Sequence, residues 1–269
     1  MKKVSLNVKK VNKDKKSYKL NQFSRTELLI GRDSIDKLKN SKVAVFGIGG
    51  VGSFVVEGLV RAGVGNFVLI DDDKVCLTNL NRQIIATRKT VGKYKVEVMK
   101  ERILEINPNA NVTIYQEFFM PGNNQDIITS DLDYVVDAID TVTAKIEIIT
   151  RCKSLNIPVI SSMGTGNKLD PSKLQITDIY KTSVCPLAKV IRKELRKRNV
   201  KNVNVIFSTE EPIKLDQNLE CSCKVNCICP PGTKRKCSTK NQVPGSISFV
   251  PSVAGLMIAG KVVTDIIKK

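Results

Sequence analysis

The stretch that decides the fold reads Lys42-Val-Ala-Val-Phe46, followed at once by Gly47-Ile-Gly-Gly-Val-Gly52. The first part is an apolar run rich in β-branched side chains, which predicts a buried strand of a parallel sheet. The glycines that follow have the spacing G-x-G-x-x-G. Such glycines permit a tight turn, let the backbone approach a phosphate, and allow the next helix to pack closely on the strand. We therefore expect a nucleotide-binding turn at the end of this strand.

Strand-like and helix-like segments alternate beyond this turn. Residues 53–62 predict a helix whose N-terminus suits an anion. Residues 67–70 predict a second strand, and Asp71 ends it about 20 residues beyond the glycines, where an acid usually binds a ribose hydroxyl. Further strands are expected at residues 112–115, 133–139 and 157–161, and further helices at residues 23–40, 92–106 and 143–155. The alternation predicts an α/β fold, with a Rossmann-like, mostly parallel sheet and helices on both faces.

Three charged residues beyond Asp71 indicate which nucleotide is bound. Arg82 is a fixed cation in a polar segment, and Lys95 lies in the first turn of a helix, where a cation is unfavourable unless an anion lies nearby. Asp140 follows a strand and offers the oxygen ligand that Mg²⁺ prefers. Because two cations suit a triphosphate, these residues favour ATP and the adenylation of a carboxylate. An NAD-dependent oxidoreductase is supported only by the glycines and Asp71, and the chain has no histidine to serve as the usual general acid–base.

Several motifs occur together along the chain. In order, they are Phe23-Ser-Arg25, Gly47-Ile-Gly-Gly-Val-Gly52, Ile70-Asp71-x-Asp73-x-Val75, Thr78-Asn79-x-Asn81-Arg82-Gln83, Val91-Gly92-x-x-Lys95 and Asp137-Ala-Ile-Asp140. As a set they resemble the ubiquitin-activating-enzyme-like adenylating superfamily, which includes the activators of bacterial sulfur-carrier proteins. Within it, residues 78–83, 181–187 and 207–210 resemble the tRNA threonylcarbamoyladenosine dehydratases.

This resemblance implies a fold, a reaction and a set of site residues. It implies the ubiquitin-activating-enzyme-like adenylation fold with a C-terminal appendage, ATP and Mg²⁺ as cofactors, tRNA carrying threonylcarbamoyladenosine as substrate, and a homodimer. The residues implied as catalytic are Arg82, Lys95, Asp140, which would hold Mg²⁺, and Arg25, which would act across the dimer interface. Those implied as nucleotide-binding are Gly47, Gly49, Gly50, Gly52, Asp71, Asp73, Asn79, Asn81, Arg82 and Lys95.

The expected reaction is an ATP-dependent dehydration that closes a ring on the modified base through an acyl-adenylate. The alternative is an adenylyltransferase that activates a ubiquitin-like sulfur-carrier protein. A binding-only protein without activity is disfavoured, because Arg82, Lys95 and Asp140 are all present.

The net charge of +18 indicates an anionic partner. Lysines gather in residues 2–19, and lysines and arginines gather at helical spacing in residues 189–201. Two such runs fit a polyanion such as tRNA, although each could also be a solvated face. Sulfur-carrier proteins are often acidic too, so the charge does not choose between the two reactions.

Five of the eight cysteines gather in one segment: Cys221, Cys223, Cys227, Cys229 and Cys237. The first four could bind zinc or an iron–sulfur cluster, although C-x-C pairs differ from the usual C-x-x-C zinc knuckle. The sulfur-carrier activators hold zinc with two C-x-x-C pairs, a spacing that this chain lacks. A metal site, a redox or sulfur-handling role with a sulfur-transfer protein partner, and a mobile loop remain alternatives. Cys237 is a candidate counterpart of the single thioester cysteine of those activators.

We divide the 269 residues into three parts. Residues 1–22 are a basic N-terminal extension, and residues 23–180 are the nucleotide-binding adenylation core. Residues 181–269 carry the basic helix, a Cys-rich insertion at about 216–240 and a terminal helix. The apolar stretch 250–263 is interrupted and short, so we expect it to pack on the domain or on a second subunit rather than span a membrane. No apolar signal segment follows Met1, which favours a cytoplasmic protein with no membrane partner.

Overall fold

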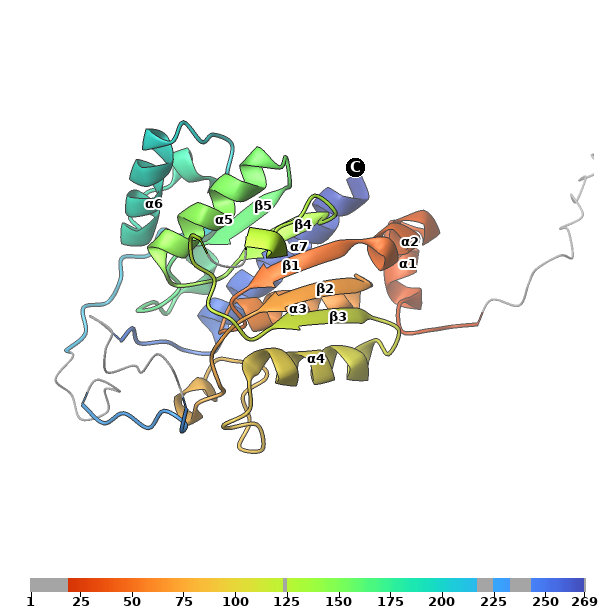
Figure 1. Cartoon of the computed structure of the whole chain (residues 1–269), viewed down its shortest axis with the longest axis horizontal. Helices are drawn as coiled ribbons and strands as arrows, with labels where there is room; N and C mark the ends of the chain where they lie inside the picture. The colour runs from red at the N-terminus through yellow and green to blue at the C-terminus, as the bar shows by residue number, and fades with distance from the viewer. Residues whose placement is uncertain (1–18, 123–124, 217–224, 233–242, 269) are drawn as a thin grey trace, which may run out of the picture.

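A central β-sheet is covered by helices on both faces (Figure 1). The computed structural model describes residues 19–122, 125–216, 225–232 and 243–268. Within them, seven strands form one sheet in the order β3-β2-β1-β4-β5-β7-β6. They are β1 (Lys42–Phe46), β2 (Asn66–Ile70), β3 (Asn111–Tyr115), β4 (Tyr134–Asp137), β5 (Val159–Ser162), β6 (Leu174–Asp178) and β7 (Asn204–Ser208). Neighbouring strands are parallel except β6 and β7. The predicted α/β architecture is therefore confirmed.

The helices follow the strands along the chain. The α-helices are α1 (Ser24–Ile30), α2 (Arg32–Asn40), α3 (Gly52–Ala62), α4 (Lys95–Ile106), α5 (Val142–Ser154), α6 (Pro186–Lys197) and α7 (Phe249–Lys268). Short 3₁₀ turns are η1 (Leu77–Asn79), η2 (Gln125–Ile127), η3 (Pro171–Lys173) and η4 (Ile179–Lys181). Residues after 181 supply β7 to the same sheet and α7 to the same core.

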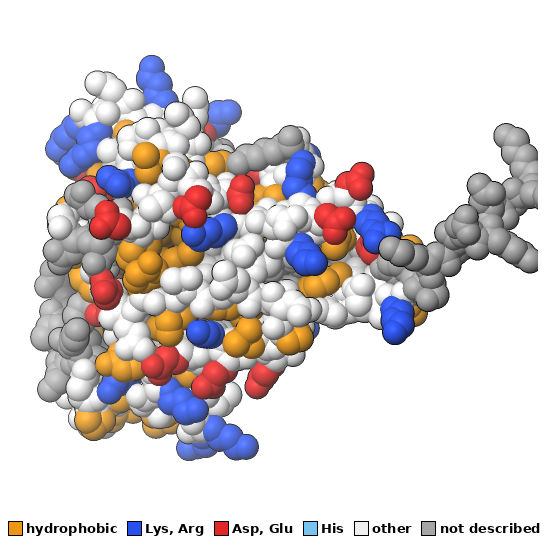
Figure 2. Space-filling model, turned by 45° about the vertical axis from the view of Figure 1, so that its right-hand side comes forward, with side chains coloured by type: hydrophobic (Ala, Val, Ile, Leu, Met, Phe, Trp, Pro, Cys, Tyr) orange, Lys and Arg blue, Asp and Glu red, His pale blue; other side chains and the backbone are white. Residues whose placement is uncertain are grey.

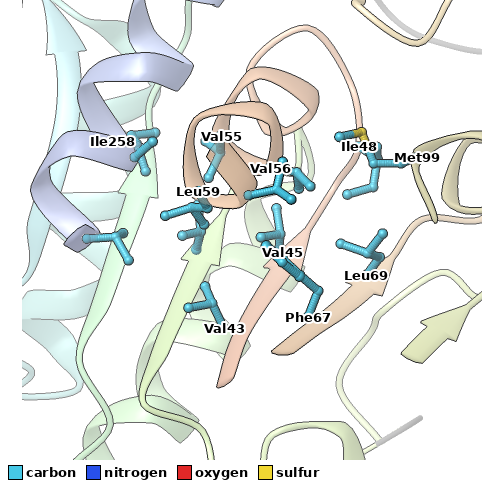
Figure 3. Close-up of a cluster of buried hydrophobic side chains, with 14 of the residues drawn as sticks. Val43, Val45, Ile48, Val55, Val56, Leu59, Phe67, Leu69, Met99 and Ile258 are labelled. Carbon is cyan, nitrogen blue, oxygen red and sulfur yellow. The ribbon is translucent and has the colours of Figure 1, made fainter. Parts of the chain in front are cut away.

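The two faces of the sheet have separate cores because side chains alternate along each strand. Val43 and Val45 of β1 pack with residues of α3, α4 and α7, as the close-up in Figure 3 shows for α3 and α7. Ala44 and Phe46 point to the opposite face and pack with residues of α5. A third cluster joins α5 to α6 and β7. Both faces are thus buried, which explains why the strands read as continuous apolar runs.

Helix α7 is long and apolar enough to cross a membrane by length and composition alone. Here, however, eight of its residues are buried, and it packs closely against α3. A Cβ atom at Gly255 would lie 2.5 Å from the Val51 carbonyl oxygen, so only glycine fits at that contact. The Tyr134 hydroxyl donates a hydrogen bond to Asp265 near the other end of α7. In this fold α7 is a core helix.

Several sequence-based boundaries were wrong. The expected helix at 23–40 is two helices, because Gly31 between them has φ = 80°, a left-handed value that ends α1. The expected strand at 133–139 is shorter, and the chain leaves the sheet after Asp137. Strands β6 and β7 were not predicted, since their antiparallel pairing joins residues far apart in the sequence.

Candidate nucleotide and catalytic site

A cavity of about 690 Å³ opens at the carboxyl ends of β1, β2, β4 and β5. After β1 the chain continues to β2 on one side of the sheet, and after β4 it continues to β5 on the other side. Open α/β sheets bind ligands at such a reversal, which here lies between β1 and β4. The predicted residues that line the cavity are Gly47, Gly49, Gly50, Asp71, Asp73, Asn79, Arg82, Lys95 and Asp140. Gly52, Asn81 and Arg25 do not line it. The structure therefore brings most of the predicted site together.

The glycine turn after β1 depends on two close approaches of the backbone. Gly47 has φ = 87°, and a Cβ atom there would lie 2.7 Å from the Ala138 carbonyl oxygen. A Cβ atom at Gly52 would lie 1.8 Å from the Gly47 carbonyl oxygen. Gly52 therefore permits the turn itself, whereas Gly49 and Gly50 line the cavity. Helix α3 begins at Gly52, so its N-terminus faces the same space.

Asp71 fixes the loop that follows β2. Its carboxylate accepts hydrogen bonds from the backbone N–H of Ile48 (2.7 Å) and of Asp73 (2.8 Å), which ties the glycine turn to the end of β2. The side chain is only 9 % exposed. Burial raises the pKa of the Asp71 carboxyl, and the nearby Lys95 ammonium opposes that rise. This is the position expected for a ribose ligand.

Lys95 lies at the start of α4 and is buried at the cavity wall. Its ammonium lies 2.8 Å from the Asp73 carboxylate and 3.8 Å from that of Asp71. Burial alone would lower the pKa of Lys95, but the Asp71 and Asp73 carboxylates raise it above its ordinary value. A cation at the start of a helix is expected to have an anion nearby. For Lys95, the Asp71 and Asp73 carboxylates are that anion. Lys93 is exposed and lies just before α4 rather than on it.

The segment 76–83 forms a compact turn around η1. The Asn79 side chain accepts a hydrogen bond from the Cys76 N–H (3.0 Å), and Arg82 Nη1 donates to the Thr78 carbonyl oxygen (3.0 Å). Arg82 also donates to Asn81, whose amide donates to the Ser246 carbonyl oxygen (2.8 Å). Asn79 and Asn81 thus hold the loop that carries Arg82 and connect it to the segment before α7.

Asp140 is exposed at the cavity, just after β4. A buried ion pair holds the turn that presents it. Asp137 and Lys145 are both fully buried, with 3.0 Å between the carboxylate and the ammonium, and Lys145 also donates to the Ser162 carbonyl oxygen (2.7 Å). Asp137 further accepts hydrogen bonds from Ser161 and from the Ile139 N–H. Sequence reasoning missed Lys145, because a lone lysine in a helix normally indicates a solvated face.

The loop after β5 closes the other side of the cavity. Residues 164–166 line it. Sequence reasoning missed Lys168, which also lines the cavity although it is only 3 % exposed. Its position directly after the Gly164-Thr-Gly166 loop was the available signal.

The described part of the cysteine segment lies against the cavity. Cys229 lines it, and the Cys227 and Cys229 sulfur atoms are 3.2 Å apart. The buried Cys76 thiol lies 3.6 Å from the Ile228 carbonyl oxygen. Cys221, Cys223 and Cys237 lie outside the described residues, so the predicted four-cysteine site stays a prediction.

Arg25 lies on α1, at the opposite end of the sheet from the cavity (Figure 1). No residue of α1 is buried, and Leu28 and Leu29 are 87 % and 86 % exposed. Within one subunit Arg25 does not join the site.

Comparisons with known proteins identify relatives along nearly the whole chain. Residues 23–269 match the ThiF family. The chain is 46 % identical over 250 residues to a tRNA threonylcarbamoyladenosine dehydratase of Bacillus subtilis, covering 93 % of this chain and 96 % of that protein. It is 38 % identical to the enzyme of the same name from Haemophilus influenzae, covering 88 % and 90 %. The crystal structure of the Escherichia coli tRNA N6-threonylcarbamoyladenosine dehydratase in complex with ATP superposes with a TM-score of 0.79 at 34 % identity, covering 92 % and 94 %.

Proposed function

Because this chain belongs to the ThiF family, we propose that it is an ATP-dependent tRNA threonylcarbamoyladenosine dehydratase. The observation that carries the proposal is the meeting of Lys95, Arg82 and Asp140 in one cavity beside the glycine turn. Two cations suit the phosphates of ATP, and a carboxylate suits the Mg²⁺ that accompanies them. The relatives from Bacillus subtilis and Haemophilus influenzae, both named tRNA threonylcarbamoyladenosine dehydratase, support the choice of substrate. The substrate is tRNA, and the reaction takes place in the cytoplasm.

The chain's own residues bind and orient the nucleotide. Asp71 binds the ribose hydroxyls, and the turn at 47–52 with the N-terminus of α3 receives the phosphates. Lys95 and Arg82 offset the charge that grows on the departing pyrophosphate. Lys95 can keep its contact with Asp73 while doing so, because an ammonium has three hydrogen-bond donors.

The substrate carboxylate attacks the α-phosphorus, the bond to the β-phosphate breaks, and pyrophosphate leaves. A nucleophilic group of the modified base then attacks the acyl carbon, AMP leaves with the bond electrons, and the proton of the nucleophile goes to solvent. The ring closes with net loss of water, because the oxygen of the old carboxylate departs on AMP. Such chemistry depends mainly on positioning and charge compensation.

Asp140 is the residue that would hold Mg²⁺. Its exposed carboxylate at the cavity fits a hard cation that prefers oxygen ligands and retains several waters. When bound, the ion neutralises phosphate charge.

The direct test incubates the protein with ATP, Mg²⁺ and tRNA carrying threonylcarbamoyladenosine, followed by mass spectrometry of the nucleosides. We expect the dehydrated, cyclic nucleoside together with AMP and pyrophosphate. If the nucleoside stays unchanged while a sulfur-carrier protein is adenylated at its C-terminal carboxylate, the alternative function is correct.

Arg25 would complete the site of a second subunit. The exposed Leu28 and Leu29 beside it on α1 fit a homodimer interface. Mixed dimers of an Arg25→Ala subunit and a Lys95→Ala subunit should therefore regain part of the activity, because one of the two sites is then intact. The rate of nucleoside conversion measures this, and mixtures no more active than the separate variants would contradict it.

Helix α6 would bind the phosphate backbone of tRNA. Lys189 and Lys193 are exposed, and Figure 2 shows Lys and Arg side chains gathered over the end of the molecule that α6 forms. Reversing both charges (Lys189→Glu, Lys193→Glu) should weaken tRNA binding. The negative slope of log affinity against log salt should become shallower by about 2.

ATP binding should not change in this α6 variant. The matched control reverses Lys37 and Lys39 on α2, which are exposed at the far end of the sheet. An equal loss of affinity in the control would mean that α6 contributes only to the net charge.

The cysteine segment would bind zinc or an iron–sulfur cluster through Cys221, Cys223, Cys227 and Cys229. The short distance between the Cys227 and Cys229 sulfur atoms supports this. Protein purified under reducing conditions should then contain stoichiometric metal, and a Cys227→Ser, Cys229→Ser variant should lose it. Metal-free wild-type protein would contradict the metal site and leave a mobile or redox-active loop as the better interpretation.

A further inference from the structure

Lys168 is a buried cation with no partner among the residues that the structure describes. The residue is 3 % exposed and lines the cavity. No carboxylate of a described residue forms an ion pair with it, and no described residue accepts its hydrogen bond. Lysines are almost never buried without a partner, because removing an ammonium from water without compensation is costly. The fold therefore holds a positive charge ready for an anion that enters from outside.

The backbone on both sides of Lys168 is fixed. Asn167 exchanges hydrogen bonds with Gly245, through its own N–H (2.8 Å) and its side-chain oxygen (2.7 Å). Glu210 accepts hydrogen bonds from the N–H groups of Leu169 and Asp170 (both 2.9 Å), so its carboxylate is used by the backbone rather than by the lysine. A cation held in this way is preorganised, and little ordering is needed when the anion binds.

Lys168 lies on a different side of the cavity from the phosphate-binding cations. Lys95 is paired with Asp71 at the end of β2, whereas Lys168 follows β5. β1 and β4 lie between these strands, so the strand ends are roughly 14 Å apart at the usual spacing of neighbouring strands. The strand order therefore places the two lysines on different sides of the cavity, where each can face a different part of the bound substrates.

We propose that Lys168 binds the carboxylate of the threonylcarbamoyl group that is to be adenylated. This inference rests on the proposed function and names the residue that recognises its second substrate. A phosphate of the tRNA backbone is the less suitable anion, because Lys168 lines the cavity rather than the outer surface. The carboxylate is the group that must enter the cavity, since it attacks the α-phosphate there.

The same ammonium serves both steps of the reaction. It pairs with one carboxylate oxygen while the other oxygen attacks the α-phosphorus, which orients the nucleophile. In the acyl-adenylate it donates a hydrogen bond to the carbonyl oxygen. Negative charge grows on that oxygen when the nucleophile of the base attacks, and the ammonium stabilises it. No proton leaves Lys168 in either step.

The test compares tRNA that carries threonylcarbamoyladenosine with the same tRNA carrying plain adenosine. Binding is measured with an ATP analogue whose α–β bridge is methylene, so that no turnover occurs. The wild type should bind the modified tRNA more tightly. In Lys168→Met this preference should fall roughly 10- to 100-fold, the range for one charge-assisted hydrogen bond. Affinity for plain tRNA and for ATP should not change, and Lys168→Arg should restore part of the preference.

Thermal unfolding separates recognition from folding. Because Lys168 loses no partner on replacement, Lys168→Met should have a melting temperature at least equal to that of the wild type. An unchanged preference in a folded Lys168→Met, with conversion as fast as in the wild type, would overturn this inference alone. Loss of ATP affinity in Lys168→Met would also overturn it, because the lysine would then bind phosphate. A wild type that neither prefers nor converts the modified tRNA would overturn both this inference and the proposed function.

Discussion

Lys95→Met should slow the conversion of threonylcarbamoyladenosine by roughly 10²- to 10³-fold, the usual cost of removing one preorganised group that stabilises developing charge. Methionine keeps roughly the length of the side chain but removes the ammonium that pairs with Asp73. Asp71 and Asp73 would then repel the phosphates without compensation, so affinity for ATP should fall as well. Single-turnover kinetics with ATP and modified tRNA measure the chemical step.

Two further variants give this prediction its controls. Asp140→Ala should abolish conversion, because it removes the carboxylate proposed to hold Mg²⁺. Lys93→Met is the matched neutral variant, since Lys93 is exposed two residues away and does not line the cavity. It should keep wild-type activity. A Lys95→Met enzyme that is as active as Lys93→Met would show that charge at this position is not needed.

Lys145→Met should lower the free energy of unfolding by about 3–5 kcal/mol, the usual cost of removing one partner of a buried ion pair. Both side chains are fully buried, and Lys145 connects Asp137 on β4 to the Ser162 carbonyl oxygen on β5. Without the ammonium, the buried Asp137 carboxyl group would lose its counter-charge and keep hydrogen bonds only from Ser161 and the Ile139 N–H among the described contacts. Unfolding in urea, followed by circular dichroism, measures the loss.

The double variant Asp137→Asn, Lys145→Met separates charge from packing. Asparagine removes the uncompensated charge, so the double variant should be more stable than Lys145→Met alone. Equal stability of the single and double variants would mean that lost packing rather than the buried charge sets the cost. Folded Lys145→Met should also need more Mg²⁺ for activity, because the turn carrying Asp140 loses its support.

The sequence alone determined those features that depend on residues close together in the chain. The strand at 42–46 and the glycine turn after it were predicted correctly, because apolar runs and glycine spacing express backbone and packing requirements of neighbouring residues. The positions of Asp71, Arg82, Lys95 and Asp140 at one cavity also followed, since the carboxyl ends of parallel strands meet at one edge of a sheet.

What only the tertiary structure decided depends on residues far apart in the chain. Lysine normally indicates a solvated surface, so nothing local marks Lys145 as the buried partner of Asp137. The loop before Lys168 places that residue near the cavity, but its burial there is set by the tertiary structure. The antiparallel pairing of β6 with β7 was equally hidden, because its partners become neighbours only when the sheet forms. The same holds for the Lys95 ammonium, which Asp73 binds across 22 positions of sequence. Burial and long-range pairing arise only when the core assembles. The type of a residue and the pattern of its sequence neighbours therefore do not specify them.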